Sequence, residues 1–395
     1  MPSQPDQAGF LPLDQMHALV ARLMQLGYQC LGPTVENGAI VMREMRAPDA
    51  LPRGLQAEQA PGRYRLTQDP LNRYFAWANG PQAIKPQTFA PTESLWRVAR
   101  DAAGALQFEA VVPDVPAQAI IGVRACDLAA MAVQDAHFLR EGRYDAHYAE
   151  RRERLFLVAV QCAEPAATCF CASTGDGPTP TAGYDLALAE LAEGFVVEAG
   201  SGKGAAVLDA LNLAAATPQQ IDAARQQGPV AAAAQTRSLP GRNLRDALMS
   251  RLEHPRWDEV AARCLACGNC TAVCPTCFCH AEVDEPALNG QSSEHARIWD
   301  SCFGESHGHL HGFNVRPDIK SRYRQWLTHK LATWHDQFGR SGCVGCGRCI
   351  AWCPTGIDLT EEVAALMSGT DQPSDATSKH STRPASGQVA AYPRP

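Results

Sequence analysis

Apolar and polar positions near the start of the chain predict a helix followed by strands. Residues 13–24 carry apolar side chains at helical intervals, and Gly27 ends the predicted helix. In residues 30–42 apolar and polar side chains alternate, as in a short β-hairpin. Further short strands, separated by proline and glycine, are predicted over 64–66, 74–78 and 106–112.

The next part of the chain has the pattern of a buried sheet with intervening helices. Residues 119–123 and 155–160 are short apolar runs, typical of parallel strands that are covered on both faces. Helical spacing is found at 128–139 and at 184–192, which gives a βαβ-type arrangement with right-handed crossovers. These patterns predict an α/β domain with a mixed or parallel sheet over residues 1–212.

The remaining chain is predicted to be mainly helical. Residues 213–252 contain many glutamines and a run of alanines, which favours a helical linker. Residues 323–338 place tryptophan and leucine side chains on one side of a further helix. Residues 367–395 are rich in serine, threonine, proline and glycine with few apolar residues, so we expect a disordered tail there.

Composition narrows the class of protein. A chain of 395 residues can form two or three domains, and 45% hydrophobic with 19% charged residues is typical of a soluble globular protein. A net charge of −7 argues against a general nucleic-acid binder, and neither a leader nor a membrane span is apparent. We therefore expect a cytoplasmic protein whose sixteen cysteines are metal ligands or free thiols.

The C-terminal half contains the run C-x2-C-x2-C-x3-C-P twice, at 264–275 and at 343–354. This is the ferredoxin run for a [4Fe–4S] cluster, in which the fourth cysteine binds the other cluster. The first predicted cluster has the ligands Cys264, Cys267, Cys270 and Cys353. The second has the ligands Cys343, Cys346, Cys349 and Cys274. Structural zinc is the alternative, but it does not explain why the third cysteine, the fourth cysteine and the proline recur.

The two runs are separated by 68 residues, more than compact ferredoxins with β-hairpins use. Because this spacer contains the predicted helix 323–338, we expect an all-α two-cluster ferredoxin domain over residues 253–366. The spacer is also basic, which fits either a solvated helix face or a docking face for a partner.

Eight further cysteines lie outside the two runs, and the string Thr-Cys-Phe-Cys occurs twice, at 168–171 and 276–279. Two of them follow the predicted strands 119–123 and 155–160, at the edge where open α/β sheets bind ligands. One candidate third cluster therefore has the ligands Cys126, Cys162, Cys169 and Cys171. The second copy of the string could instead pair with the first across a domain interface, and packing cysteines are the simplest alternative.

Three other cysteines form a trio without an evident fourth ligand. These candidate additional ligands are Cys277, Cys279 and Cys302, with His280 or Cys30 as the fourth. Cysteine this dense in a cytoplasmic chain favours metal or redox chemistry over packing alone.

Nucleotide-binding signals are weak. Residues 200–204 resemble a phosphate loop, but Val197 stands where its first glycine is required, and no G-x-G-x-x-G lies between a strand and a helix. We therefore expect no flavin or NAD site and no catalytic residue in this chain, which would carry electrons without binding the hydride carrier.

The cysteine-rich stretches resemble the beta subunit of sulfhydrogenases, the cytoplasmic NAD(P)-linked [NiFe] hydrogenases, and the corresponding iron–sulfur subunit of anaerobic sulfite reductase. The stretches that carry the resemblance are 122–127, 168–171, 264–279, 299–302, 322–330 and 342–349. The resemblance implies a non-catalytic iron–sulfur subunit that relays electrons between a flavin-containing NAD(P)H diaphorase subunit and a [NiFe] hydrogenase module. The alternatives are the same role in a sulfite or sulfur reductase, with sulfite reductase subunits as partners, or a self-contained iron–sulfur reductase. Neither nucleic acid nor membrane is an expected partner.

Overall fold

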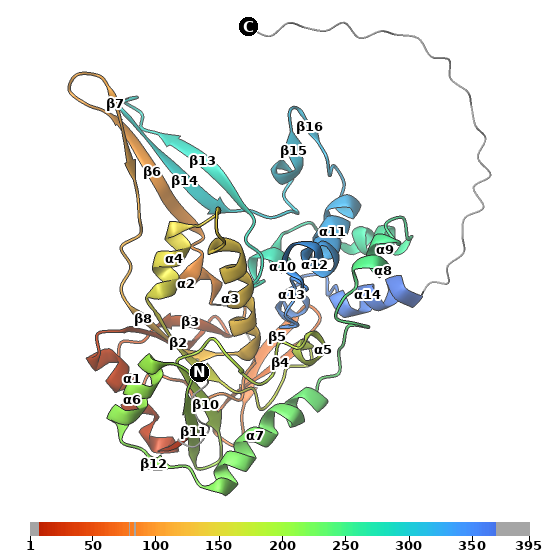
Figure 1. The fold of residues 1–395 in the computed structure, drawn as a ribbon. Coiled ribbons are helices and arrows are strands. Elements are labelled where there is room, and N and C mark those ends of the chain that lie inside the picture. Colours follow the sequence, from red (N-terminus) through yellow and green to blue (C-terminus); the bar gives the residue numbers. More distant parts are fainter. Residues whose placement is uncertain (1–7, 79, 83, 369–395) are drawn as a thin grey trace, which may run out of the picture.

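The computed structural model describes residues 8–78, 80–82 and 84–368. A mixed eight-stranded sheet lies at the centre of the N-terminal half, with strand order β12-β1-β11-β10-β9-β8-β2-β3 (Figure 1). The strands are β1 (Gly9–Pro12), β2 (Gln29–Glu36), β3 (Ala39–Glu44), β8 (Gln118–Val123), β9 (Leu155–Val160), β10 (Leu186–Glu190), β11 (Gly194–Ala199) and β12 (Ala214–Ala215). Strands β2, β8, β9 and β10 pair in parallel and the other pairs are antiparallel, which confirms the predicted mixed sheet.

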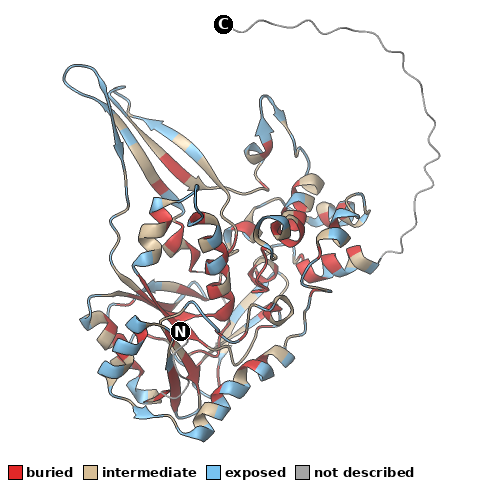
Figure 2. Ribbon diagram, in the orientation of Figure 1, coloured by how far each residue is buried: buried red, intermediate tan, exposed pale blue. Residues whose placement is uncertain are grey.

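Both faces of this sheet are covered by helices, as its apolar strands require. Alternate residues of β9 point to opposite faces. Phe156 and Val158 pack in the core that contains α1, whereas Leu155 and Leu157 pack in the core that contains α3. The covering helices are α1 (Met16–Gln25), α3 (Ala125–Phe138), α4 (Ala146–Glu153), α6 (Gly202–Leu211) and α7 (Pro218–Ala233). Most of the central strands of this sheet are buried between these helices (Figure 2).

Two local predictions in this half are wrong. The segment 184–192 is not helical but contains strand β10, because Leu186 and Leu188 alternate into the sheet core. The segment 74–78 is not a strand. Its backbone groups bond to side chains instead: Glu190 accepts the N–H groups of Tyr74 and Phe75, at 2.7 and 2.8 Å. A segment whose N–H groups are satisfied in this way needs no partner strand.

A second, four-stranded antiparallel sheet projects from the body of the molecule (Figure 1). Its order is β13-β14-β6-β7, and its strands are β6 (Thr92–Arg100), β7 (Leu106–Ala110), β13 (His280–Pro286) and β14 (Ser292–Trp299). Strands from both halves of the chain therefore share one sheet. The expectation of an all-α ferredoxin domain is not confirmed, because the spacer between the cysteine runs forms this hairpin and the short pair β15 (His309–Leu310) and β16 (Phe313–Asn314).

Helices surround the two cysteine runs. They are α8 (Arg245–Met249), α9 (Arg256–Arg263), α10 (Asn269–Ala272), α11 (Ile319–Thr328), α12 (Trp334–Phe338), α13 (Arg348–Ala351) and α14 (Leu359–Ser368), with a π-helical turn over His329–Thr333. Trp326, Leu327 and Leu331 are buried in one core with Trp257 of α9, so the predicted apolar side of 323–338 is confirmed. The predicted tail, 367–395, lies outside the described residues apart from the last two residues of α14.

Three smaller elements complete the fold. A hairpin of β4 (Leu55–Ala60) and β5 (Arg63–Gln68) lies near α13, and the short helices α2 (Lys85–Thr88) and α5 (Cys171–Thr174) border the cysteine-rich regions. Across the part of the chain that the structure describes, no helix has the length and apolarity needed to span a bilayer.

Candidate iron–sulfur sites

The first cysteine run forms a tight loop between α9 and α10. Cys264 ends α9, and Ala266 and Gly268 adopt positive φ values of 50° and 75°, which turns the chain back on itself. The four cysteines predicted for the first cluster line a single cavity with Cys349 and the aromatic side chains of Phe303, Tyr323 and Trp326. The fourth of them, Cys353, comes from the second run, after α13. The cavity is therefore closed by thiols from both runs and by an apolar wall.

The second run lies deeper in the molecule. Cys343, Cys346 and Cys349 are close enough to Cys274 of the first run to influence one another electrostatically, and burial with these neighbouring thiols raises the pKa of Cys349. The last cysteine of each run therefore lies near the first three cysteines of the other run.

A buried lysine lies beside the second group. The ammonium of Lys330 is 3.4 Å from Cys274 Sγ and 2.9 Å from Thr276 Oγ1. Burial alone would lower the pKa of Lys330, but Cys274, Cys277 and Cys343 outweigh burial and raise it. Lys330 belongs to the π-helical turn, a feature that is often found at functional sites. An ammonium group at this position would stabilise negative charge on these thiols.

A third group of cysteines lies at the edge of the large sheet. Strands β8 and β9 are parallel neighbours, so their carboxyl ends meet at the same edge. Cys126 follows β8 and Cys162 follows β9, and both line one cavity with Cys169 and Cys171. Burial raises the pKa of all four thiols. Gln235 Nε2 donates to Cys171 Sγ at 3.1 Å.

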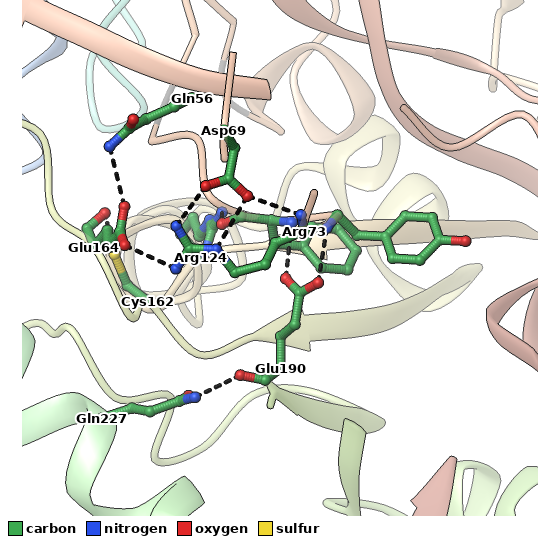
Figure 3. A network of polar contacts seen from close by, with 10 residues as sticks. Gln56, Asp69, Arg73, Arg124, Cys162, Glu164, Glu190 and Gln227 are labelled. Atoms are coloured by element: carbon green, nitrogen blue, oxygen red, sulfur yellow. Dashed lines mark hydrogen bonds and ion pairs between the residues drawn. The ribbon is translucent and has the colours of Figure 1, made fainter. Parts of the chain in front are cut away.

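Arg124 supports this sheet-edge cavity. Its guanidinium lies over the Trp77 ring at 4.7 Å and donates to the carbonyls of Phe75 and Trp77, at 3.0 and 2.6 Å. Close by, Arg73 is bound by Asp69 and Glu164 (Figure 3), at 2.8 and 2.7 Å. These charged groups fix the irregular segment that covers the cysteines.

The sheet-edge cavity and the second group share a wall. Cys346 lines the sheet-edge cavity, and the carbonyl of Gly345 accepts a hydrogen bond from the N–H of Phe170 at 2.8 Å. A Cβ at Gly345 would lie 2.6 Å from the Cys171 backbone. Arg348 forms a buried ion pair with Asp127 at 2.9 Å, between Cys346 and Cys126.

The remaining trio of cysteines is split between two contacts. The thiol of Cys277 lies beside that of Cys274, and the thiol of Cys279 lies beside that of Cys302. Neither expected fourth ligand is placed with the trio. Cys30 is buried in the core of the large sheet, where its thiol faces the carbonyls of Val20 and Tyr28. His280 bonds to the Phe278 carbonyl, and the second Thr-Cys-Phe-Cys string does not join the first.

Instead, His307 contacts Cys279. Its Nδ1 lies 2.5 Å from Asp300 Oδ2, and the hydrogen bond with Cys279 raises the pKa of His307 to about 9. His307 and Lys330 approach Cys279 and Cys274 from other parts of the chain, so the pattern around those cysteines does not select them. Arg348 lies within the second run, but its partner Asp127 comes from the N-terminal half. The repeated cysteine strings are the only local signal.

Thiolates in groups of four are the donor set that iron–sulfur clusters take, and buried positive charges nearby suit an anionic cluster. Among the described residues, no three or more His, Cys, Asp or Glu side chains converge on one point that could hold a single metal ion. The first ferredoxin-type group and the sheet-edge group each line a cavity instead, which leaves space for a polynuclear cluster. The residues present therefore fit such clusters.

The comparisons with known proteins agree with this chemistry. A family model described as a 4Fe-4S dicluster domain matches residues 263–357, so this segment belongs to the dicluster iron–sulfur class. The beta subunit of sulfhydrogenase 2 from Pyrococcus furiosus is 32% identical over 258 residues, which cover 63% of this chain and 74% of that protein. The chain belongs to the family of sulfhydrogenase beta subunits. No solved structure matches it.

Proposed function

We propose that this chain is the electron-transfer subunit of a cytoplasmic hydrogenase complex. It would relay electrons between a flavin-containing NAD(P)H diaphorase subunit and a [NiFe] hydrogenase module. The observation that carries the proposal is the continuity of the cysteine groups. Cys349 lines the first cavity, and its neighbour Cys346 lines the sheet-edge cavity, so the second group adjoins both of the others.

The two ferredoxin runs would hold two [4Fe–4S] clusters with crossed ligation. Cys264, Cys267, Cys270 and Cys353 would bind the first, and Cys343, Cys346, Cys349 and Cys274 the second. Bound clusters of this kind accept and release single electrons. The apolar wall of Phe303, Tyr323 and Trp326 would exclude water from the first, while Lys330 would stabilise the charge of the second.

A third cluster would be held by Cys126, Cys162, Cys169 and Cys171 at the sheet edge. The cavity that these cysteines share supports this assignment, as do their burial and the bond from Gln235. With this third site, the cysteine groups extend from the first ferredoxin cavity into the N-terminal half. Electrons would therefore have separate points of entry and exit.

The electron donor and electron acceptor are proposed from the similarity to the sulfhydrogenase subunit. Because the matched protein is named as a sulfhydrogenase subunit, a hydrogenase complex is the first candidate, and an anaerobic sulfite or sulfur reductase would need no change in this chain. The chain would lack a flavin or nucleotide site of its own, in keeping with the missing G-x-G-x-x-G fingerprint.

The proposal is tested with the purified chain under anaerobic conditions, by following the iron–sulfur absorbance during reduction. Dithionite should bleach the chain, whereas NADPH should do so only after a flavin-containing diaphorase is added. Stoichiometric flavin in the purified chain, or direct reduction by NADPH, would overturn the assignment as a relay and favour a self-contained reductase.

A further inference from the structure

We propose a fourth iron–sulfur centre in the C-terminal half, bound by Cys277, Cys279, Cys302 and His307. It lies outside the three cysteine groups of the relay and adds a branch beside the two ferredoxin-type sites. Its iron–sulfur character rests on the proposed function, whereas the ligand set rests on the placement of these four residues around the base of the β13–β14 hairpin.

The β13–β14 hairpin brings two of the ligands together. Its register pairs His280 with Trp299, and the N–H of Asp300 donates to the Cys279 carbonyl at 2.9 Å. The chain enters β13 directly after Cys279 and leaves β14 just before Cys302. Two cysteines 23 positions apart in sequence are therefore brought close together at the base of the hairpin.

His307 has the surroundings of a metal-binding imidazole. A ligating histidine commonly donates its second ring N–H to a carboxylate, which fixes the tautomer and the ring orientation. Here Nδ1 faces Asp300 Oδ2 at 2.5 Å, so Nε2 is the nitrogen left for a metal. The Asp300 side chain is itself held, because its Oδ1 accepts the N–H of Ser301 at 2.7 Å. The imidazole also contacts the Cys279 thiol.

The third thiolate comes from Cys277, next to two buried lysines. Lys85 donates to the carbonyls of Cys277 and Ala272, both at 3.2 Å, and lies over the Trp299 ring at 3.8 Å. Lys330 lies on the other side, beside Cys274. Two ammonium groups in one interior region are costly unless negative charge lies close by. A cluster with three thiolate ligands supplies such charge.

The location would place the centre between the two ferredoxin-type groups. Cys302 lies close enough to Cys270 to feel its charge, and Cys277 contacts Cys274. One neighbour belongs to each cysteine group, so the centre could exchange electrons with both. A reversible disulfide between Cys279 and Cys302, or a zinc ion, are the competing occupants, and the experiment separates them.

The test measures iron, acid-labile sulfide and zinc in the full chain after anaerobic reconstitution with ferrous iron and sulfide. Cys279→Ser/Cys302→Ser should contain about four irons fewer than the wild type and keep the EPR signals of the other clusters. Cys30→Ser is the matched control, since that thiol is also buried but lies in the sheet core. Its iron content should be unchanged.

A second variant distinguishes the loss of a cluster ligand from misfolding of the protein. His307→Cys should retain full iron but lower the potential of one cluster, because replacing thiolate by imidazole ligands raises potentials and the reverse change should lower them. Unchanged iron content in Cys279→Ser/Cys302→Ser would overturn the inference. Loss of zinc alone from this variant would also overturn it. So would a Cys279–Cys302 disulfide found by mass spectrometry of the alkylated wild-type protein. A wild-type chain without iron would contradict the proposed function, whereas about twelve irons in the wild type and in the double variant would contradict only this fourth centre.

Discussion

The cysteines of the two halves reach their cavities by different routes. In the C-terminal half, three thiols of each ferredoxin-type group come from seven consecutive residues, and loops with positive φ curve the chain around them. In the N-terminal half, Cys126 and Cys162 are 36 positions apart and meet only because β8 and β9 are parallel neighbours.

The two kinds of site therefore depend on the rest of the fold to different degrees. A local loop keeps its thiols close whatever surrounds it, so its ligands can be recognised in the sequence. A sheet-edge site exists only when the sheet is formed and its covering segment is in place. Here that cover depends on Arg124 and Glu190, whose side chains bind the backbone of 74–78.

The largest expected effect comes from breaking the crossed ligation. Cys353→Ser should remove the cluster of the first run, with about four irons lost per chain, because Cys353 closes the cavity lined by Cys264, Cys267 and Cys270. EPR of the dithionite-reduced protein should show that the signal of the second run is retained. Loss of the second run's signal instead would mean that each run binds its own cluster.

The sheet-edge site is tested by Cys162→Ser/Cys169→Ser in the full chain. About four irons should again be lost, while both ferredoxin-type signals remain, because these thiols line a cavity of their own. Cys30→Ser serves as the control from the same sheet. A double variant with wild-type iron content would show that these cysteines only pack.

The contact between the two halves is tested by Arg348→Met. This change leaves Asp127 as an unpaired buried carboxylate, so the free energy of unfolding should fall by about 3–5 kcal/mol. Removing positive charge beside Cys346 and Cys126 should also lower the cluster potentials, by on the order of 50–100 mV. Denaturant unfolding and redox titration measure the two effects. Arg348→Lys should restore part of the potential, whereas a loss of stability without a shift in potential would mean that Arg348 is structural only.

A smaller effect is expected where the projecting sheet joins the body. Glu93 of β6 binds Arg151 at 2.7 Å and also binds Arg297 of β14. Burial alone would raise the pKa of Glu93, but hydrogen bonds from His147, Arg151 and Arg297 lower it to about 2. Glu93→Gln should therefore cost about 2 kcal/mol of stability at neutral pH.

The stabilisation that Glu93 provides should depend on pH. Since the pKa of Glu93 is depressed by folding, its contribution is present above the ordinary value of 4.5 and declines as the pH falls toward 2. The difference in unfolding free energy between wild type and Glu93→Gln should shrink over that window. A difference that stays constant down to about pH 3 would mean that the carboxylate charge plays no part.

Much of this could be predicted from the sequence where the signal is local. The helix near the N-terminus, the strands around 119–123 and 155–160, and the grouping of the ferredoxin cysteines all follow from short-range patterns. The segment of strand β10 has the pattern of a helix because 184–192 is rich in alanine and leucine, and only its pairing with β9 and β11 decides its conformation.

What could not be predicted from the sequence depends on distant partners. The hairpin 280–299 pairs with β6, from the N-terminal half of the chain. The pairing of its own two strands brings Cys279 to Asp300, which also binds His307. Lys330 and Arg348 are ordinary basic residues in the sequence. Their burial beside cysteine groups follows from the π-helical turn and from the ion pair with Asp127.

We propose that the sheet-edge cysteines continue the path of the ferredoxin-type clusters. The most direct measurement is an EPR-monitored reductive titration of the intact chain, compared with Cys162→Ser/Cys169→Ser. We expect at least three reduced clusters in the wild type, with signals broadened by magnetic coupling through the wall that contains Cys346, and loss of that broadening in the variant. Two clusters with the same coupled spectrum in both proteins would contradict it.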